Sequence, residues 1–374
     1  ASVDGDANDL PSVLGAMTSL ASALAECDKK EEAATLLQNV LDKTRASLGE
    51  GEDDHASVLS ATSNLARVVS DAAEAERMFR EVREKTRAKL GEDHADTLSA
   101  MQKLSDHLAD QGKLVEGEQI SRDVLERTRA KMGEDHRETL AGIQNLSSIL
   151  AEQEKYEEAS QLSREALELT TSKLGENHVQ TLVCMNNLAG LLAEQGQHDE
   201  AEQMYRKIFE SMRTTLGYEN SNTLAAAYSL AGLLQQRKKI GEMEALFREM
   251  LEEMRSKLGE HHLNTLSILN NLANLLADQD KFAEAEELCQ LGLEGMRSTL
   301  GNDHPVTVGS IQLLATIMRK QEKLDKAEEF IKEALESTRK LLGDYHPHTL
   351  TALYNQGSLL ADRGDLEQAE PMYR

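Results

Sequence analysis

Hydrophobic and polar positions follow a helical period along this chain. Between Thr181 and Leu216, apolar residues recur at steps of three and four, which is the spacing of one face of an α-helix. A short polar interruption contains Gly196, placed where the end of a helix favours a left-handed residue. The apolar period then resumes and stops at Gly217. The segment therefore predicts two antiparallel helices joined as a hairpin.

The same unit recurs along the chain with a fixed period. A glycine that follows leucine or methionine returns every 42 residues, within the pattern Leu-Gly-Glu-x-His-x-x-Thr-Leu. These glycines are Gly49, Gly91, Gly133, Gly175, Gly217, Gly259, Gly301 and Gly343. A regular period of this length indicates an array of like hairpins, in which each hairpin buries its apolar face against its neighbours.

The period predicts how the chain is organised. We expect a lead-in at residues 1–12 and one array over residues 13–374, with eight full units and a ninth cut short at Arg374. The units span about 13–48, 55–90, 97–132, 139–174, 181–216, 223–258, 265–300, 307–342 and 349–374. Because the ends of a repeat stack need a cover, the short ninth unit favours a longer array or an end covered by another surface.

Composition narrows the class of protein. Only 3% of the residues are aromatic and four are proline, while good helix formers dominate, so we predict an all-α fold. Lys and Arg number 41 against 66 Asp and Glu, a net charge of −25, which predicts no binding to nucleic acid. No apolar run reaches the roughly 20 residues that span a bilayer. Three scattered cysteines favour a reducing compartment, so we expect a soluble protein of the cytoplasm or an organelle lumen.

The small residues of each unit carry a resemblance to a known family. Leu188-Ala189 in the first helix and Ala201-x3-Tyr205 in the second resemble the tetratricopeptide repeat. The 42-residue length and the loop from Leu342 to Leu350 are similar to the repeats of kinesin light chains. The resemblance implies a right-handed α-solenoid whose first helices line a concave groove that binds a peptide or a partner protein.

The sequence contains no constellation typical of catalysis or cofactor binding. Catalytic groups must converge within about 3 Å of a reacting atom, whereas the histidines of this chain recur one per loop. They are His94, His136, His178, His262, His304 and His346. We expect each to make a loop hydrogen bond or a packing contact, and none to bind a metal. Thr139 and its equivalents are expected to cap the first helices. We predict no enzyme activity, no cofactor and no metal.

A row of amide side chains is the candidate binding site. An amide both donates and accepts hydrogen bonds, so it can pair with the backbone of an extended peptide whatever the peptide's sequence. The amides that precede the Leu-Ala motif are Asn64, Gln102, Gln144, Asn145, Asn186, Asn187, Asn270, Asn271, Gln312 and Asn355. Lys103 is the one cation in this row. The alternative is that these amides hydrogen-bond between repeats.

An acidic row near the end of the first helices has two interpretations. It comprises Glu26, Asp110, Glu152, Glu194, Asp278 and Asp362. The helix dipole disfavours acids at this place, so a basic peptide could be the partner. We favour local pairing with Lys113, Lys155 and Lys281, three residues further on.

These observations predict a non-enzymatic scaffold that binds a peptide segment or a partner protein along the concave groove. Two alternatives stay open. The array could be an architectural subunit that packs into a larger assembly through its convex face or its ends. It could also be the sensing arm of a longer multidomain protein.

Overall fold

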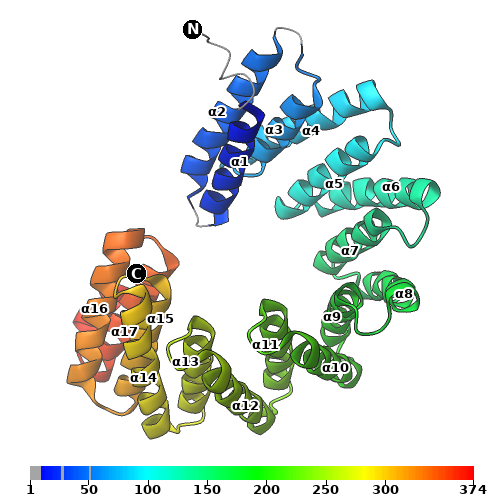
Figure 1. Cartoon of the computed structure of the whole chain (residues 1–374). Coiled ribbons are helices and arrows are strands. Elements are labelled where there is room, and N and C mark those ends of the chain that lie inside the picture. The colour runs from blue at the N-terminus through cyan, green and yellow to red at the C-terminus, as the bar shows by residue number, and fades with distance from the viewer. Residues whose placement is uncertain (1–9, 27–28, 50–51) are drawn as a thin grey trace, which may run out of the picture. The chain divides into compact units, whose positions relative to one another are not determined.

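The computed structural model describes residues 10–26, 29–49 and 52–374, and these ranges form eighteen α-helices and no strand (Figure 1). The prediction of an all-α fold is therefore confirmed. Residues 1–9 of the expected lead-in, and Cys27, lie outside the described residues. The chain divides into two compact units, Ala1–Ala201 and Glu202–Arg374, and each is described by itself.

The helices alternate as first and second members of hairpins. From α5 to α17 every odd-numbered helix has 16 residues, and from α2 to α16 every even-numbered helix has 19. The first ten helices are α1 Leu10–Glu26, α2 Lys30–Leu48, α3 Ala56–Ala66, α4 Ala72–Leu90, α5 Ala95–Asp110, α6 Leu114–Met132, α7 Arg137–Glu152, α8 Tyr156–Leu174, α9 Val179–Glu194 and α10 His198–Leu216. The others are α11 Ser221–Gln236, α12 Ile240–Leu258, α13 Leu263–Asp278, α14 Phe282–Leu300, α15 Pro305–Lys320, α16 Leu324–Leu342, α17 Pro347–Asp362 and α18 Leu366–Tyr373.

Within each unit, the first helices of successive hairpins pack directly against one another. In the first unit α5 contacts α7 and α7 contacts α9, and in the second unit α13 contacts α15 and α15 contacts α17. The second helices fill the outer side of each stack (Figure 1). The exposed positions of the odd-numbered helices therefore form a surface of their own, which we call the inner face.

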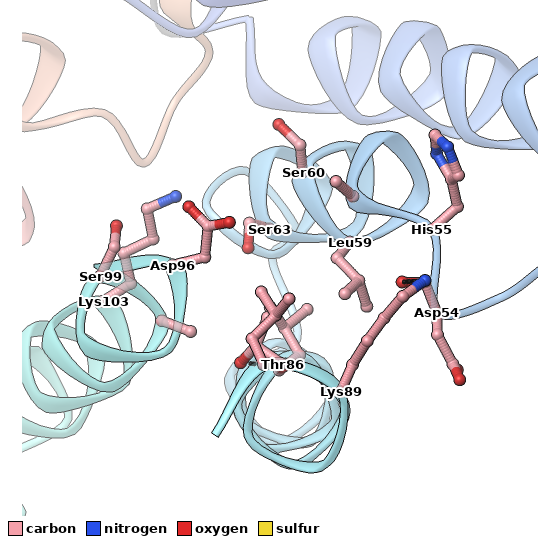
Figure 2. Close-up of a pocket in the computed structure, with 14 residues that line it drawn as sticks. Asp54, His55, Leu59, Ser60, Ser63, Thr86, Lys89, Asp96, Ser99 and Lys103 are labelled. Carbon is pink, nitrogen blue, oxygen red and sulfur yellow. Dashed lines mark hydrogen bonds between the residues drawn. The ribbon is translucent and has the colours of Figure 1, made fainter. Parts of the chain in front are cut away.

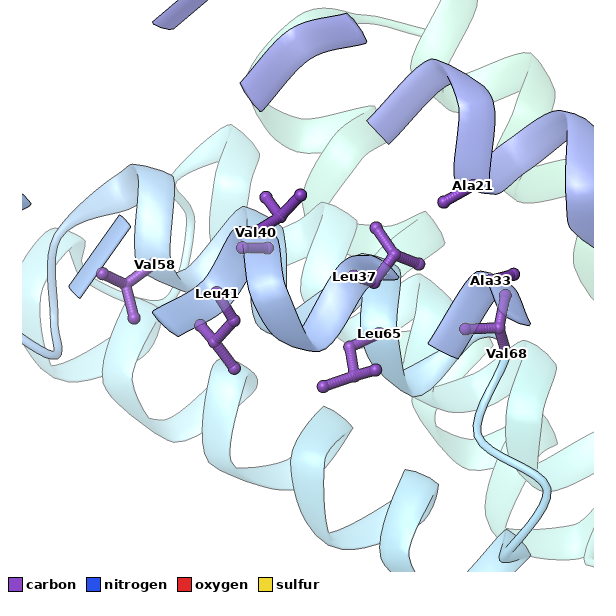
Figure 3. Close-up of a cluster of buried hydrophobic side chains, with 9 residues drawn as sticks. Ala21, Ala33, Leu37, Val40, Leu41, Val58, Leu65 and Val68 are labelled. Carbon is purple, nitrogen blue, oxygen red and sulfur yellow. The ribbon is translucent and has the colours of Figure 1, made fainter. Parts of the chain in front are cut away.

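The core of each hairpin continues into the next one. Figure 3 shows this at the start of the first unit, where Leu37 and Leu41 of α2 pack with Leu65 of α3. Where two helices approach most closely the chain has alanine, as at Ala159, which is fully buried. A larger side chain at such a place would hold the helices apart, which explains the small residues of the repeat.

The loop histidines cap the first helices, and the threonines do not. The Nδ1 atom of His136 accepts a hydrogen bond from the backbone N–H of Glu138 at 3.2 Å. Equivalent bonds occur at His55, His94, His178, His262, His304 and His346. The expectation for Thr139 is wrong, because its buried hydroxyl donates to the carbonyl of Gly133 at 2.7 Å. Thr139 comes two residues after the helix begins, where its hydroxyl meets the loop rather than the free N–H groups.

We expect His136→Ala to lower the free energy of unfolding by about 1 kcal/mol, because it leaves a helix N-terminal N–H without its acceptor. His136→Asn is the matched control, since Asn220 holds the equivalent place before α11 and accepts from the N–H of Asn222 at 2.9 Å. Urea denaturation followed by circular dichroism measures both variants. An equal loss in the two would contradict the capping role.

Candidate functional site: the inner face

On α7 and α9 the inner face combines small residues with one amide and one acid per helix. On α7 its positions are Ala141, Asn145, Ser148 and Glu152, which follow at steps of four, three and four. The equivalent residues of α9 are Val183, Asn187, Gly190 and Glu194. Because the intervening side chains are small, the amide and the acid are the longest polar side chains that a ligand on this face of α7 and α9 would meet.

All ten amides of the predicted row lie on first helices, but they do not share one direction. The Nε2 atom of Gln144 on α7 contacts Sγ of Cys184 on the following first helix at 3.6 Å. Likewise, Nε2 of Gln312 on α15 donates to the carbonyl of His348 on α17 at 3.0 Å. Asn271 of α13 points the other way and donates from Nδ2 to Tyr228 Oη of α11 at 3.2 Å. These three amides therefore connect neighbouring first helices.

The remaining amides differ in whether they have a protein partner. Gln102 donates to Asp106 Oδ1 at 2.9 Å and to Ser121 Oγ at 3.3 Å. Asn187 is exposed and the other unpaired amides are half-buried. In the described ranges, the amides without any side-chain hydrogen bond are Asn64, Asn145, Asn186, Asn187, Asn270 and Asn355. Their donors and acceptors are available to a ligand.

Three acids of the first unit stand at the ends of α5, α7 and α9 without a partner. Asp110, Glu152 and Glu194 are exposed, and no described residue forms an ion pair or side-chain hydrogen bond with them. In the second unit the equivalent acids are paired, Asp278 with Lys320 at 3.9 Å and Asp362 with Arg319 at 2.6 Å. Glu152 and Glu194 place negative charge about two helical turns beyond the free amides Asn145 and Asn187, on the same helices.

The lysines expected to neutralise these acids turn away from them, so the prediction of local pairing is wrong. Lys113 Nζ lies 2.6 Å from Glu76 Oε2, and Lys155 Nζ lies 2.8 Å from Glu118 Oε2. Lys281 pairs with Glu244 in the same way. Each lysine immediately precedes a second helix, so its side chain reaches the second helix of the preceding hairpin. The side chain of Glu26 lies outside the described residues.

These pairs form an outer ladder of charges, in which Glu118 and Glu244 each accept bonds from a following hairpin. Burial opposes ionisation of Glu118, but hydrogen bonds from Lys155, Arg122 and Gln153 lower its pKa to about 2. A hydrogen bond from Lys281 lowers the pKa of Glu244 to about 2, against the cost of burial and with help from its other donors. The ladder is structural, because it ties successive second helices together.

A cavity of about 460 Å³ opens between α3, α4 and α5 (Figure 2). Leu59, Val82 and Ala100 form its apolar side and make a separate small core cluster. Asp96 and Lys103 project from α5 at its rim. Sequence reasoning missed this feature. Its signal was that Ser63 is shorter than the equivalent Gln144 and Gln312, and that Lys103 stands where α7 and α9 have asparagine.

The described ranges contain no group of three or more His, Cys, Asp or Glu side chains arranged to hold a metal ion. His107, which replaces an apolar residue of the other repeats, is half-buried, and its Nε2 lies 3.2 Å from the carbonyl oxygen of Ala72. None of the described helices combines the length and hydropathy needed to cross a membrane.

Comparison with known sequences defines the family. Profiles of the tetratricopeptide repeat match residues 102–172, 139–214 and 307–374, and residues 13–57, 58–96 and 265–306. These matches cover most of the chain, so it belongs to the tetratricopeptide-repeat family. No curated protein matches the sequence. Tetratricopeptide repeats form a protein-interaction fold, and this chain is a protein-interaction scaffold.

Solved structures with a TM-score of 0.50 or more share the fold at low identity. The apo quorum sensor NprR from B. thuringiensis has a TM-score of 0.54 and 13% identity, over 98% of this chain and 97% of its own. BtubC (BKLC) from P. vanneervenii has a TM-score of 0.50 and 19% identity, over 63% of this chain and 94% of its own. Kinesin light chain repeats from Podosopora anserina have a TM-score of 0.48 and 21% identity, over 55% and 97%.

Proposed function

We propose that the inner face of the first unit binds an extended peptide segment of a partner protein, by hydrogen bonding and without catalysis. The single observation that carries the proposal is the set of amides without a protein partner. Asn145 and Asn187 occupy equivalent positions on neighbouring first helices and neither has a side-chain hydrogen bond within the described residues. A primary amide offers both a donor and an acceptor, which is what a peptide backbone requires.

The exposed acids on the same face predict the charge of the proposed peptide. Asp110, Glu152 and Glu194 lie exposed at helix C-termini, where the helix dipole adds to their negative potential. A lysine or arginine of the peptide would relieve this repulsion, because Lys113 and Lys155, the lysines that follow Asp110 and Glu152, pair with second helices instead. We therefore expect the bound segment to carry basic residues, and we infer that nucleic acid, which is anionic, is not a partner.

The double variant Asn145→Ala/Asn187→Ala tests the proposal. Dodecapeptides are first selected from a random display library on the immobilised protein, and their affinities are then measured by fluorescence anisotropy. Two lost hydrogen bonds should weaken binding by about tenfold or more. Gln119→Ala removes an exposed amide from the second helix α6 and should leave the affinity unchanged. Unaltered binding by the double variant, with an unaltered circular dichroism spectrum, would exclude the amides as backbone readers.

A further inference from the structure

At the cavity between α3 and α5, the chain has a shorter side chain than the equivalent glutamines of α7 and α15. Ser63 stands at the place that Gln144 occupies on α7 and Gln312 on α15. In those hairpins the amide spans the gap to the following first helix, as the 3.0 Å bond from Gln312 to the carbonyl of His348 shows. The hydroxymethyl group of Ser63 is too short to span the same gap, so space remains between α3 and α5.

The cavity presents one cation without a partner. Lys103 is half-buried at the rim, and within the described ranges its ammonium group has neither an ion pair nor a hydrogen bond (Figure 2). Burial and the nearby charge of Arg67 lower the pKa of Lys103, and Asp96 acts in the opposite direction. The other lysine of the lining, Lys89, donates to the carbonyl of Asp54 at 3.2 Å. An anion beside Lys103 would replace the interactions with water that burial removed.

We propose that this cavity binds a small amphiphilic monocarboxylate, with its apolar part on Leu59, Val82 and Ala100 and its carboxylate on the Lys103 ammonium. The volume of about 460 Å³ lies within the range of small-molecule pockets. Asp96 on the same rim repels a second negative charge, so the site suits one carboxylate rather than a dianion. This function is separate from peptide binding and needs none of the unpaired amides.

The ligand would connect α3 with α5, as the side chains of Gln144 and Gln312 connect other neighbouring first helices. It contacts both helices and closes the gap that Ser63 leaves, so the bound state of this junction is more stable than the free state. Occupancy therefore stabilises the part of the inner face that includes Lys103 and Asn64. Binding of a small molecule would therefore stabilise the packing of α3 against α5 in the first unit.

Octanoate and its neutral counterpart octanamide test the proposal on the full chain. A ligand of about ten heavy atoms should bind with a Kd of roughly 0.1–1 mM, so titrations extend to several millimolar. Methyl-detected NMR follows the resonances of Leu59 and Val82, which should shift and saturate with octanoate. Octanamide should bind about tenfold more weakly, because it cannot form the charge-assisted bond.

Three variants test separately the charged part of the site, which is Lys103, and its apolar space. Lys103→Asn places there the residue of the equivalent position on α7, and it should weaken octanoate about tenfold while leaving octanamide unchanged. Ser63→Gln and Ala100→Ile introduce side chains that Gln144 and Ile268 supply at equivalent positions, and both should abolish binding by filling the cavity. Ser148→Gln on the inner face of α7 is the matched control and should bind as the unaltered chain does.

Two results would overturn the proposal. One is the absence of saturable shifts at Leu59 and Val82. The other is equal affinity for octanoate and octanamide in both the unaltered chain and Lys103→Asn, which would mean that Lys103 recognises no anion. Neither result bears on the selected peptides, whose binding to the Asn145→Ala/Asn187→Ala variant is measured separately, so the two proposals fail independently.

Discussion

Replacing Leu150 by alanine should lower the free energy of unfolding by about 2–5 kcal/mol, the cost of removing a fully buried leucine. Leu150 is 0% exposed and belongs to a core cluster that includes Ile143 of α7, Ala159 of α8 and Cys184 of α9. The cavity left behind cannot collapse easily, because buried side chains from several helices surround it and each is fixed by its own packing. Urea denaturation monitored at 222 nm measures the loss.

The effect of Leu150→Ala should reach beyond its own hairpin. In a repeat stack each hairpin is stabilised by its neighbours, so a weakened interface is felt by the hairpins on both sides. Leu174→Ala is the control, since Leu174 ends α8 with 38% of its surface exposed, and it should cost less than about 1 kcal/mol. Equal losses in the free energy of unfolding for the two variants would mean that the buried core does not stabilise the stack more than an exposed position does.

The double variant Glu118→Gln/Glu244→Gln should lower the free energy of unfolding at neutral pH by about 2–4 kcal/mol. Each carboxylate is only 12% or 15% exposed and accepts bonds from an arginine and a lysine, and such bonds contribute about 1.5–3 kcal/mol each. The expected loss is smaller than the sum of four such bonds, because the partner cations are nearly half exposed and solvent screens them. Chemical denaturation at pH 7 measures the difference.

The same carboxylates make stability depend on pH in a known direction. Both pKa values are lowered to about 2 in the folded chain, against about 4.3 when the chain is unfolded. Their contribution is therefore complete above about pH 4.3 and is lost as the pH falls from there towards 2. We expect the unaltered chain to lose stability steeply over this interval and the double variant to lose it less steeply.

A third variant provides the reference for the acid titration. Glu126→Gln removes an exposed carboxylate from α6 that forms no ion pair with any described residue, and its stability should follow the unaltered chain from pH 7 to pH 2. Were the double variant to show the same acid dependence as Glu126→Gln, the outer ladder would not be the source of the acid sensitivity.

The polar contacts of the loops show where sequence reasoning stops. A hydroxyl near a helix start usually indicates a cap, yet the loop places the ring of His136 over the free N–H groups and turns Thr139 towards the carbonyl of Gly133. The choice depends on the path of the loop after Gly133, whose φ is 92°. That path is a property of the folded backbone and cannot be read from residue types.

The lysines of the hairpin turns show likewise that residue types do not decide which charges pair. Sequence proximity suggests that Lys155 pairs with Glu152, but its ammonium group pairs with Glu118, 37 residues earlier. The stacking of hairpins brings successive second helices together, and a long side chain at their start reaches the earlier helix first. Asp110 and Glu152 of the first unit are consequently left without an ion-pair partner among the described residues, which changes the kind of peptide that this unit is proposed to bind.

The sequence by itself determined the helices, the hairpins and the buried positions, because the 42-residue period and the three- and four-residue apolar steps are local properties of the chain. Only the tertiary structure decided which polar groups meet. Gln144 and Asn271 are both amides of the predicted row, yet one reaches the following first helix and the other the preceding one. The stacking of hairpins decides which way a polar side chain points, which residue it bonds and where a gap remains, as beside Ser63. Each of these depends on the distance between residues about one repeat apart.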